Sequence, residues 1–344
     1  MTEELIITKP DDMHLHLREG ETLKHVVMHT AKQFARAIVM PNLENPVTTV
    51  TMANRYCQEI KKHIGDSLFN PLMTLYFNDS LDSDELKKVR DSDNIIGIKL
   101  YPAGVTTNSK DGVSDFKNCL PIFKMMEEFD IPLLIHCEVS DKNVDIFDRE
   151  KVFIDKYLIN FHKYFPSLRI IFEHISTKEA AQFVLESGPT IAATITPQHL
   201  LLNRNDLFSG GIRPHHYCLP VLKRSAHQTA IVDAALSGSP KFFLGTDSAP
   251  HPKNQKESSC GCAGIYSALS AIELYAEVFY KNNAINLLEN FSSKYGASFY
   301  NLPINSSKIK LVKKPLHIPE SIQIGKDQII PLFAGKTINW HLSS

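Results

Sequence analysis

The sequence contains no long hydrophobic run, since none reaches the ~18 consecutive apolar residues that cross a bilayer. It also lacks an excess of charge of either sign, because 37 basic residues oppose 38 acidic ones and the formal net charge is −1. Proteins that bind nucleic acid or membrane surfaces usually carry a basic surplus. We therefore expect no nucleic-acid partner and no membrane association.

Cysteine is sparse as well. The 344 residues include six cysteines, which are scattered apart from the pair Cys260 and Cys262. Their spacing is not that of a disulfide framework, and a chain of this length does not need one. The opening segment MTEELIITKPDD lacks the basic-then-apolar order of a signal peptide. These absences predict a cytoplasmic protein with free thiols.

Low-complexity segments and repeats of fixed period are absent, and a regular alternation takes their place. Short apolar runs rich in β-formers alternate with longer segments of helical periodicity. The runs predict strands at 13–17, 36–40, 71–77, 95–100, 131–136, 169–173, 190–195 and 241–245. The other segments predict helices at 21–32, 50–63, 83–89, 117–128, 144–164, 178–187, 226–236, 264–281 and 287–300.

Eight strand–helix units over roughly 290 residues predict an α/β protein with a single (β/α)8 TIM barrel. A doubly wound open sheet is the alternative, although no Gly-x-Gly-x-x-Gly motif follows the first run, which disfavours its dinucleotide-binding version. We expect one domain over 1–344, with the barrel at about 9–304 and a C-terminal extension at about 305–344 packed on it. Within the extension, 321–324, 328–332 and 336–340 predict short strands.

Ligand-type side chains occur where the predicted strands end. Side chains at positions i and i+2 of a strand point the same way, so the pair His14 and His16 presents two imidazoles on one side. The carboxyl ends of barrel strands meet at one rim. The residues that share this rim are His14, His16, Lys99, His136, His174 and Asp247. Their convergence predicts a metal site.

The residue types indicate the metal. Four imidazoles and a carboxylate suit Zn²⁺, with Mn²⁺, Co²⁺ or Fe²⁺ as alternatives. They are many for one tetrahedral ion and suit two ions about 3.5–4 Å apart, which need a bridging anion. An ammonium group beside two dications would be disfavoured. We therefore expect Lys99 to be uncharged and to take up CO2 as a carbamate that bridges the ions.

These motifs resemble the dihydroorotases of the amidohydrolase superfamily, in particular the short bacterial type that stands as a separate enzyme. The similarity runs from about Lys9 to Trp340. The matching segments are 10–18, 37–42, 99–102, 132–136, 172–175, 193–199 and 245–251. The departures from the family's pattern, none of which removes a ligand, are Met13, Cys137, Gly104 and Val105.

The resemblance implies reversible cyclisation of N-carbamoyl-L-aspartate to L-dihydroorotate in de novo pyrimidine synthesis. It implies that His14, His16 and Asp247 hold one metal, that His136 and His174 hold the other, and that carbamylated Lys99 bridges them. A metal-bridging hydroxide would attack the ring amide carbonyl, with Asp247 as general acid and base. The family also implies a homodimer.

Further residues would recognise the substrate. Arg18 lies two positions past His16, on the same side, and can form two hydrogen bonds to a carboxylate. Asn42 and His251 resemble the family's other carboxylate contacts. The backbone groups that resemble those reading the ring amide belong to Leu219 and Ala263, and Thr106 and Thr107 resemble a lid that closes over substrate.

Two alternatives remain open. Another cyclic amide hydrolase, such as a hydantoinase or allantoinase, would share the metal ligands but would not need Arg18, Asn42 and His251. Hydantoinases and allantoinases also resemble chains with a longer segment before the His-x-His motif, whereas only thirteen residues precede His14 here. A non-catalytic scaffold relative predicts lost ligands, whereas all six are present.

Two remaining features receive structural interpretations. Cys260 and Cys262 are too few to close a tetrahedral zinc site, so we expect a tight glycine-containing loop near the active site. His199 lies near the rim and is expected to be structural.

Overall fold

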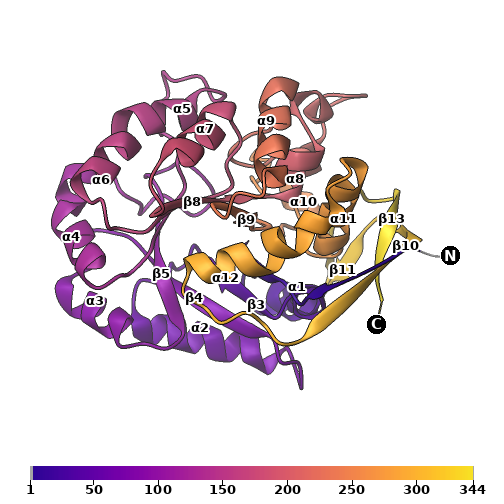
Figure 1. The fold of residues 1–344 in the computed structure, drawn as a ribbon, viewed down its shortest axis with the longest axis horizontal. Coiled ribbons are helices and arrows are strands. Elements are labelled where there is room, and N and C mark those ends of the chain that lie inside the picture. Colours follow the sequence, from indigo (N-terminus) through magenta and orange to yellow (C-terminus); the bar gives the residue numbers. More distant parts are fainter. Residues whose placement is uncertain (1–2, 344) are drawn as a thin grey trace.

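The computed structural model describes residues 3–343 and is built around an eight-stranded parallel sheet (Figure 1). The strands follow one another in chain order, so each pairs with the next along the chain. They are β2 Asp11–Leu15, β3 Arg36–Val39, β4 Asn70–Tyr76, β5 Ile95–Leu100, β6 Leu133–Ile135, β7 Ile170–Phe172, β8 Ile191–Ile195 and β9 Phe242–Leu244. Each predicted run overlaps one of these strands, which confirms the predicted order.

The sheet closes into a barrel where β2 and β9 end. A parallel bridge joins Leu15 to Ser248. Beside it, Asp247 N–H donates to the His14 carbonyl over 2.9 Å, and His16 N–H donates to the Ser248 carbonyl over 3.1 Å. Closure of a parallel sheet wrapped by helices is the (β/α)8 arrangement. It excludes the doubly wound open sheet.

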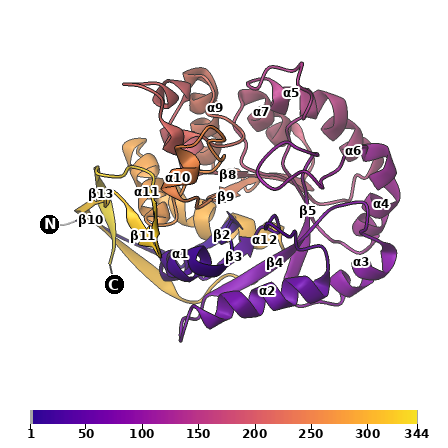
Figure 2. The same cartoon turned by 180° about the vertical axis from the view of Figure 1, so that it is seen from behind.

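Helices surround the barrel (Figures 1 and 2). They are α1 Gly20–Gln33, α2 Val50–Lys62, α3 Ser83–Arg90, η1 Phe116–Cys119, α4 Leu120–Glu128, α5 Arg149–Phe153, η2 Ile154–Leu158, α6 Ile159–Tyr164, α7 Lys178–Glu186, α8 Pro197–Leu201, η3 Arg204–Leu207, η4 Pro214–His216, α9 Ser225–Leu236, α10 Lys253–Lys256, α11 Ala271–Lys281, η5 Ile285–Leu287, η6 Asn290–Lys294 and α12 Tyr295–Phe299. Within residues 3–343, none of them combines the length and the apolar character that a membrane crossing requires.

Two predicted helices begin later than the periodicity indicated. The helix expected from 144 begins at Arg149, because the Asp145 carboxylate accepts Phe147 N–H over 2.8 Å and holds a turn instead. The helix expected from 264 begins at Ala271. Before it, Ile265 forms a parallel bridge with Ser248, and Ser248 Oγ accepts Ser267 N–H over 3.1 Å. The short helices α8 and α10 were not predicted.

The barrel interior is filled at the end opposite the site described below. Inward side chains such as Met13, Leu72 and Phe243 form one buried cluster with α12. Gly296 of α12 allows the close approach, since a Cβ there would lie 2.7 Å from Met13 Cε. The carbonyl of Phe299 accepts a hydrogen bond from Arg169, just before β7, over 2.7 Å. Helix α12 therefore covers the N-terminal ends of the strands and leaves the C-terminal ends available for chemistry.

The C-terminal extension contains β10 Lys308–His317, β11 Ile322–Ile324, β12 Asp327–Ile329 and β13 Thr337–Ser343. Strand β10 pairs antiparallel with β13 and with β1, Glu4–Thr8, so both ends of the chain share one small sheet (Figures 1 and 2). The buried ring of Trp340 lies 5.6 Å from that of Tyr280 in α11. The extension thus packs on the barrel's last large helix, as expected. Strands β1 and β10 were not predicted.

Candidate metal centre and active site

A small cavity lies at the C-terminal ends of the barrel strands. It is lined by His14, His16, Arg18, Asn42, Tyr101, Thr106, Thr107, His136, His174, Leu219, Asp247, Ala249, Ala263 and Gly264. Every predicted site residue is in this lining except Lys99 and His251. Lys99 contacts Glu173, which lies outside the lining, and His251 contacts the lining residue Ala263. A larger hollow of about 580 Å³ between α8, α9, α11 and β13 contains no histidine. Chemistry, rather than size, identifies the site.

The ends of β2 and β9 bring three predicted ligands together. Asp247 Oδ1 lies 3.0 Å from His16 Nε2 and 3.3 Å from His14 Nε2. The two imidazole Nε2 atoms are 3.3 Å apart. All three residues are buried. Their ligand atoms converge on one point, as they would around a shared cation.

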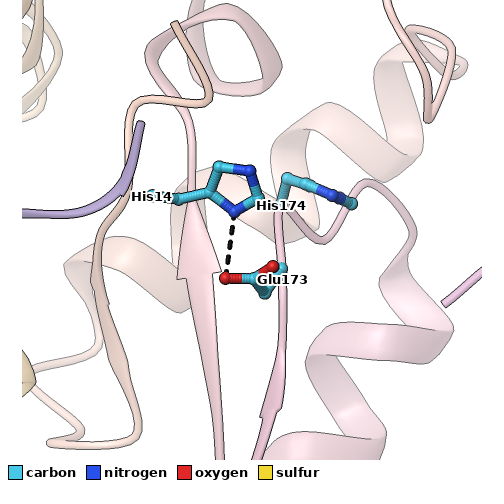
Figure 3. A group of neighbouring side chains, drawn as sticks. All are labelled: His14, Glu173 and His174. Carbon is cyan, nitrogen blue, oxygen red and sulfur yellow. Dashed lines mark ion pairs between the residues drawn. The ribbon is translucent and has the colours of Figure 1, made fainter. Parts of the chain in front are cut away.

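A second group forms around the end of β7. His14, Glu173 and His174 also place their ligand atoms within reach of one ion, and Figure 3 shows His14 paired with the Glu173 carboxylate. The contact joins His14 Nδ1 to Glu173 Oε1 over 3.0 Å. His174 N–H donates to Thr194 Oγ1 over 2.7 Å, which ties this segment to β8. His14 therefore belongs to both groups.

The other two predicted ligands have carboxylate partners. Lys99 Nζ, fully buried, forms an ion pair with Glu173 and lies 4.8 Å from the centre of the Tyr101 ring. His136 Nε2 lies 2.8 Å from Glu138 Oε2, and its ring centre is 4.7 Å from that of His174. Lys99 and His136 thus border the two groups, but their ligand atoms are directed to Glu173 and Glu138.

The backbone at this rim is held under strain by buried hydrogen bonds. Arg18, His174 and Asp247 have φ values of +59°, +45° and +46°, a region that residues other than glycine rarely occupy. The buried Asp12 carboxylate accepts Thr246 N–H over 2.8 Å and Thr246 Oγ1–H over 2.6 Å. Such outliers cluster at functional sites, where the surroundings hold them in place.

Charge in the cluster is unevenly shared. Burial alone would lower the pKa of His14, but the carboxylates of Glu173 and Asp247 raise it to about 9. Burial lowers the pKa of His16 to about 4, and burial together with His136 lowers the pKa of His174 well below its usual range. Burial alone would raise the pKa of Asp247, yet its contacts with His14 and His16 hold it well below its usual range. A protonated His14, the neutral imidazoles of His16 and His174, and ionised carboxylates therefore share one buried volume.

This donor set fits divalent cations. His14 Nδ1, Glu173 Oε1 and His174 Nδ1 are buried and lack an aligned hydrogen-bond partner, although the first two approach each other. Unpartnered buried polar atoms are costly. A cation that accepts their lone pairs would remove this cost, and nitrogen with oxygen donors suits zinc and its first-row neighbours.

Cationic and donor groups lie at the outer side of the cavity. Arg18 Nη2 is 3.0 Å from His251 Nε2, and Arg18 Nε–H donates to the Pro250 carbonyl over 3.3 Å. Burial, followed by the charge of Arg18, lowers the pKa of His251 to about 2, so its imidazole is neutral. Asn42 lines the cavity nearby. These groups can hold an anionic substituent of a ligand beside the metal-type cluster, by which we mean His14, His16, Glu173, His174 and Asp247.

The segment around Thr107 covers the cavity. Thr107 Oγ1–H donates to the Ala263 carbonyl over 3.3 Å, and Asn42 Nδ2–H donates to the Thr107 carbonyl over 3.1 Å. Asn108 Nδ2–H donates back to the Asn42 carbonyl over 3.1 Å. The free volume beneath is about 20 Å³, which is room for about one water molecule. Entry of a larger molecule therefore requires this segment to move.

Several site residues were not predicted. Glu173 and Glu138 contact predicted ligands, Tyr101 borders Lys99, and Asp12 with Thr246 braces the rim. The available signal was position, because Glu173 directly precedes His174 and Glu138 follows His136 by two residues.

The structure also shows where the cysteine pair and His199 lie. Cys260 Sγ and Cys262 Sγ lie 3.9 Å apart in a loop that contains Gly261 and leads into Ala263 at the cavity. His199 contacts Thr196 Oγ1 over 2.8 Å and the Pro220 carbonyl over 3.0 Å. Neither is among the residues that line the cavity.

Comparison with known proteins agrees with this geometry. The model of the amidohydrolase family matches residues 6–315. A dihydroorotase from Picosynechococcus sp. is 54% identical over 339 residues, which cover 98% of each chain. A dihydroorotase structure from Campylobacter jejuni is 34% identical with a TM-score of 0.92, covering 100% of this chain and 98% of that one.

Two further solved structures are similar to this chain to different degrees. A dihydroorotase from Saccharomyces cerevisiae, in complex with 5-fluoroorotic acid, is 36% identical with a TM-score of 0.92 and covers 99% of this chain and 98% of that one. A hydantoinase from Arthrobacter aurescens is 15% identical with a TM-score of 0.79, covering 98% of this chain and 83% of that one, a likeness that shows the fold alone. The chain belongs to the amidohydrolase family and, within it, to the dihydroorotases.

Proposed function

We propose that the cavity at the barrel rim interconverts L-dihydroorotate and N-carbamoyl-L-aspartate. One observation carries the proposal: a buried cluster of imidazoles and carboxylates adjoins Arg18, Asn42 and His251 within a single site. The cluster suits hydrolysis of a ring amide, and the cationic end suits the carboxylate that distinguishes dihydroorotate from a simple hydantoin. Both the site residues and the comparisons therefore favour a dihydroorotase over another cyclic amide hydrolase.

Two divalent ions, Zn²⁺ in the first instance, would be held by this chain. His14, His16 and Asp247 would hold one, and His136 and His174 would hold the other. When bound, the ions would polarise the substrate carbonyl and lower the pKa of a water molecule towards neutrality. The convergence of His14 Nε2 with His16 Nε2 and the Asp247 carboxylate supports the first site, and the buried, unpartnered His174 Nδ1 supports the second.

Lys99 would bridge the ions as a carbamate formed with CO2. Its Nζ now contacts the Glu173 carboxylate inside the barrel. A carbamate on Nζ carries negative charge, so its formation would replace this contact with repulsion from Glu173. Carbamylation would therefore be coupled to metal binding, because the added cations would offset that repulsion.

Asp247 would transfer the proton. Its carboxylate lies between His14 and His16, and its low pKa leaves it ionised and able to accept a proton from the attacking water. Asp247 would then donate this proton to the ring nitrogen as the amide bond breaks. Cyclisation uses the same transfers in reverse order.

Substrate binding would place the carboxylate against Arg18, Asn42 and His251, with the ring edge against backbone groups of Leu219 and Ala263. Thr106 and Thr107 would form the lid. The contacts of Thr107 with Asn42 and Ala263 describe its closed form, in which water is excluded from the reacting groups.

The deciding experiment is turnover of L-dihydroorotate by metal-replete protein with bicarbonate present, followed through loss of the ultraviolet absorbance of the substrate. Hydantoin and allantoin serve as competing substrates. We expect dihydroorotate to be strongly preferred. Folded, metal-loaded protein that turns over hydantoin but not dihydroorotate would overturn the substrate assignment.

We also propose a cytoplasmic homodimer. The six cysteines are all unpaired, which suits a reducing compartment. Light scattering of the purified protein gives the mass of the assembly, and a monomeric mass at micromolar concentration would contradict the dimer.

A further inference from the structure

Lys256 ends the short helix α10 with its ammonium group inside the protein. The residue is 3% exposed, and Nζ donates hydrogen bonds to the carbonyls of Tyr217, Cys262 and Gly264 over 2.8, 2.7 and 2.8 Å. Within residues 3–343, no carboxylate forms an ion pair with it. Burial of a lysine ammonium group without a carboxylate partner costs free energy. Its retention here indicates that holding the three carbonyls in place is useful.

These carbonyls belong to the two loops that line one side of the cavity. Tyr217 lies two residues before Leu219, and Cys262 and Gly264 flank Ala263. Leu219 and Ala263 both face the cavity. Gly264 N–H also donates to the Tyr217 carbonyl over 3.0 Å. One ammonium group therefore sets the spacing between the loops.

The loop next to Lys256 has a conformation that it would not adopt unaided. Cys262 has a φ of +24° and Gly264 a φ of +150°, and a Cβ at Gly264 would lie 2.8 Å from Ala249 Cβ. Such backbone persists only where surrounding contacts hold it. Lys256 supplies a charge-assisted hydrogen bond on each side of Ala263.

We propose that Lys256 is a positioning residue for substrate binding, which holds the backbone groups of Leu219 and Ala263 at the separation that the substrate ring requires. The proposal rests on the proposed function. Lys256 touches no reacting atom, so its loss affects binding of the ring more than the chemical step.

The proposal has a pH signature. The groups that face Lys256 are Tyr217, whose ring centre is 5.6 Å from Nζ, together with Cys218, Cys262 and His251. Burial lowers the pKa of Lys256 to about 8. A neutral amine has two hydrogens for three carbonyls, so one of them loses its partner. Substrate binding by the wild type should therefore weaken as the pH rises through about 8.

The experiment compares Lys256→Met, Lys256→Arg and the control Lys253→Met, an exposed lysine of the same helix. KM and kcat for dihydroorotate are measured from pH 6 to 9.5, and binding of 5-fluoroorotic acid is measured by titration calorimetry. Loss of charge-assisted hydrogen bonds should raise KM and Kd by about 10- to 100-fold in Lys256→Met, with kcat changed by less than about threefold. Lys256→Arg should restore part of the affinity and remove the loss above about pH 8.

An unchanged KM in Lys256→Met would overturn the proposal. So would a fall in kcat as large as the rise in KM, if the pH profile stayed that of the wild type. If Lys256→Met does not fold, the wild-type and Lys256→Arg profiles decide, since identical profiles contradict it. A wild type that does not turn over dihydroorotate at all would instead refute the proposed function.

Discussion

The two sides of the site are constructed differently. His14, His16 and Asp247 stand where strands end, and sheet hydrogen bonds that close the barrel hold their backbones. Thr107 and Ala263 stand on loops that are joined by hydrogen bonds from single side chains, including those of Thr107 and Lys256. The strand side, with the proposed metal ligands, thus derives its geometry from the sheet. The loop side, which we propose to contact the substrate ring, depends on contacts that can be removed one at a time.

The strand side should respond most strongly to substitution. Asp247→Asn removes the proposed proton carrier and would weaken one of the proposed metal sites, so kcat for dihydroorotate should fall by about 10³-fold or more. Steady-state kinetics with measurement of bound metal checks this. Asp233→Asn, on the exposed side of α9, is the control. Activity within tenfold of the wild type would assign the proton transfer to another group.

Lys99→Ala tests whether the strand side needs a bridging anion. We expect turnover to fall by at least about 100-fold, because loss of the proposed carbamate bridge would weaken the binding of both proposed ions. NMR of protein treated with ¹³C-bicarbonate should show a carbamate signal in the wild type and none in the variant. The exposed Lys117→Ala should behave as the wild type. A carbamate signal that persists in Lys99→Ala would place the modification elsewhere.

Helix α11 braces the strand side, since Tyr275 O–H donates to the Ile195 carbonyl over 2.6 Å. On the same helix, burial raises the pKa of Glu273 from 4.5 to about 7. The folded protein then retains a proton that the unfolded chain loses, so the free energy of unfolding should fall as pH rises from 4.5 to about 7, by up to about 3 kcal/mol.

Glu273→Gln should remove this loss and be more stable than the wild type above pH 7, with turnover unchanged. Denaturant unfolding at several pH values measures it, with the exposed Glu186→Gln as control. Parallel stability curves for wild type and Glu273→Gln would rule out a role for Glu273. A change in turnover would mean that the brace acts on the chemistry as well.

The loop side should show the smallest effect. Thr107→Val removes the hydrogen bond to the Ala263 carbonyl and keeps the side-chain shape. One such bond corresponds to a decrease in kcat/KM of about 3- to 10-fold. The exposed Thr51→Val on α2 should leave it unchanged. If Thr107→Val matched its control, lid closure would depend on Asn42 and Asn108 instead.

The strand side was the more predictable from sequence, for a physical reason. Apolar runs mark the strands of a parallel sheet locally, and the residue type just after each run marks the rim, as with His136 and His174. Contacts between strands carry no local signal. The pairing of Lys99 with Glu173, 74 positions away, depends on barrel register and was not predicted.

The loop side could be predicted only by resemblance. Leu219 and Ala263 would act through backbone groups, which leave no side-chain signature in a single sequence. The late start of α11 has the same origin, because Ser267 N–H and Ala268 N–H donate to the distant Ser248 Oγ rather than to carbonyls within a helix. Lys256 was not singled out, since a lysine that ends a short polar segment looks like a solvated one.

Closure of the barrel through the metal-type cluster has a consequence for how the protein is made. His16 and Asp247 are 231 positions apart and meet only when the first and last barrel strands join. Contacts of such long sequence separation form late, after the intervening chain has ordered. During synthesis, His14 and His16 therefore leave the ribosome long before Asp247 has been added to the chain. The proposed ion binding would thereby be linked to completion of the barrel, and bound ions should stabilise the whole fold rather than one segment of it.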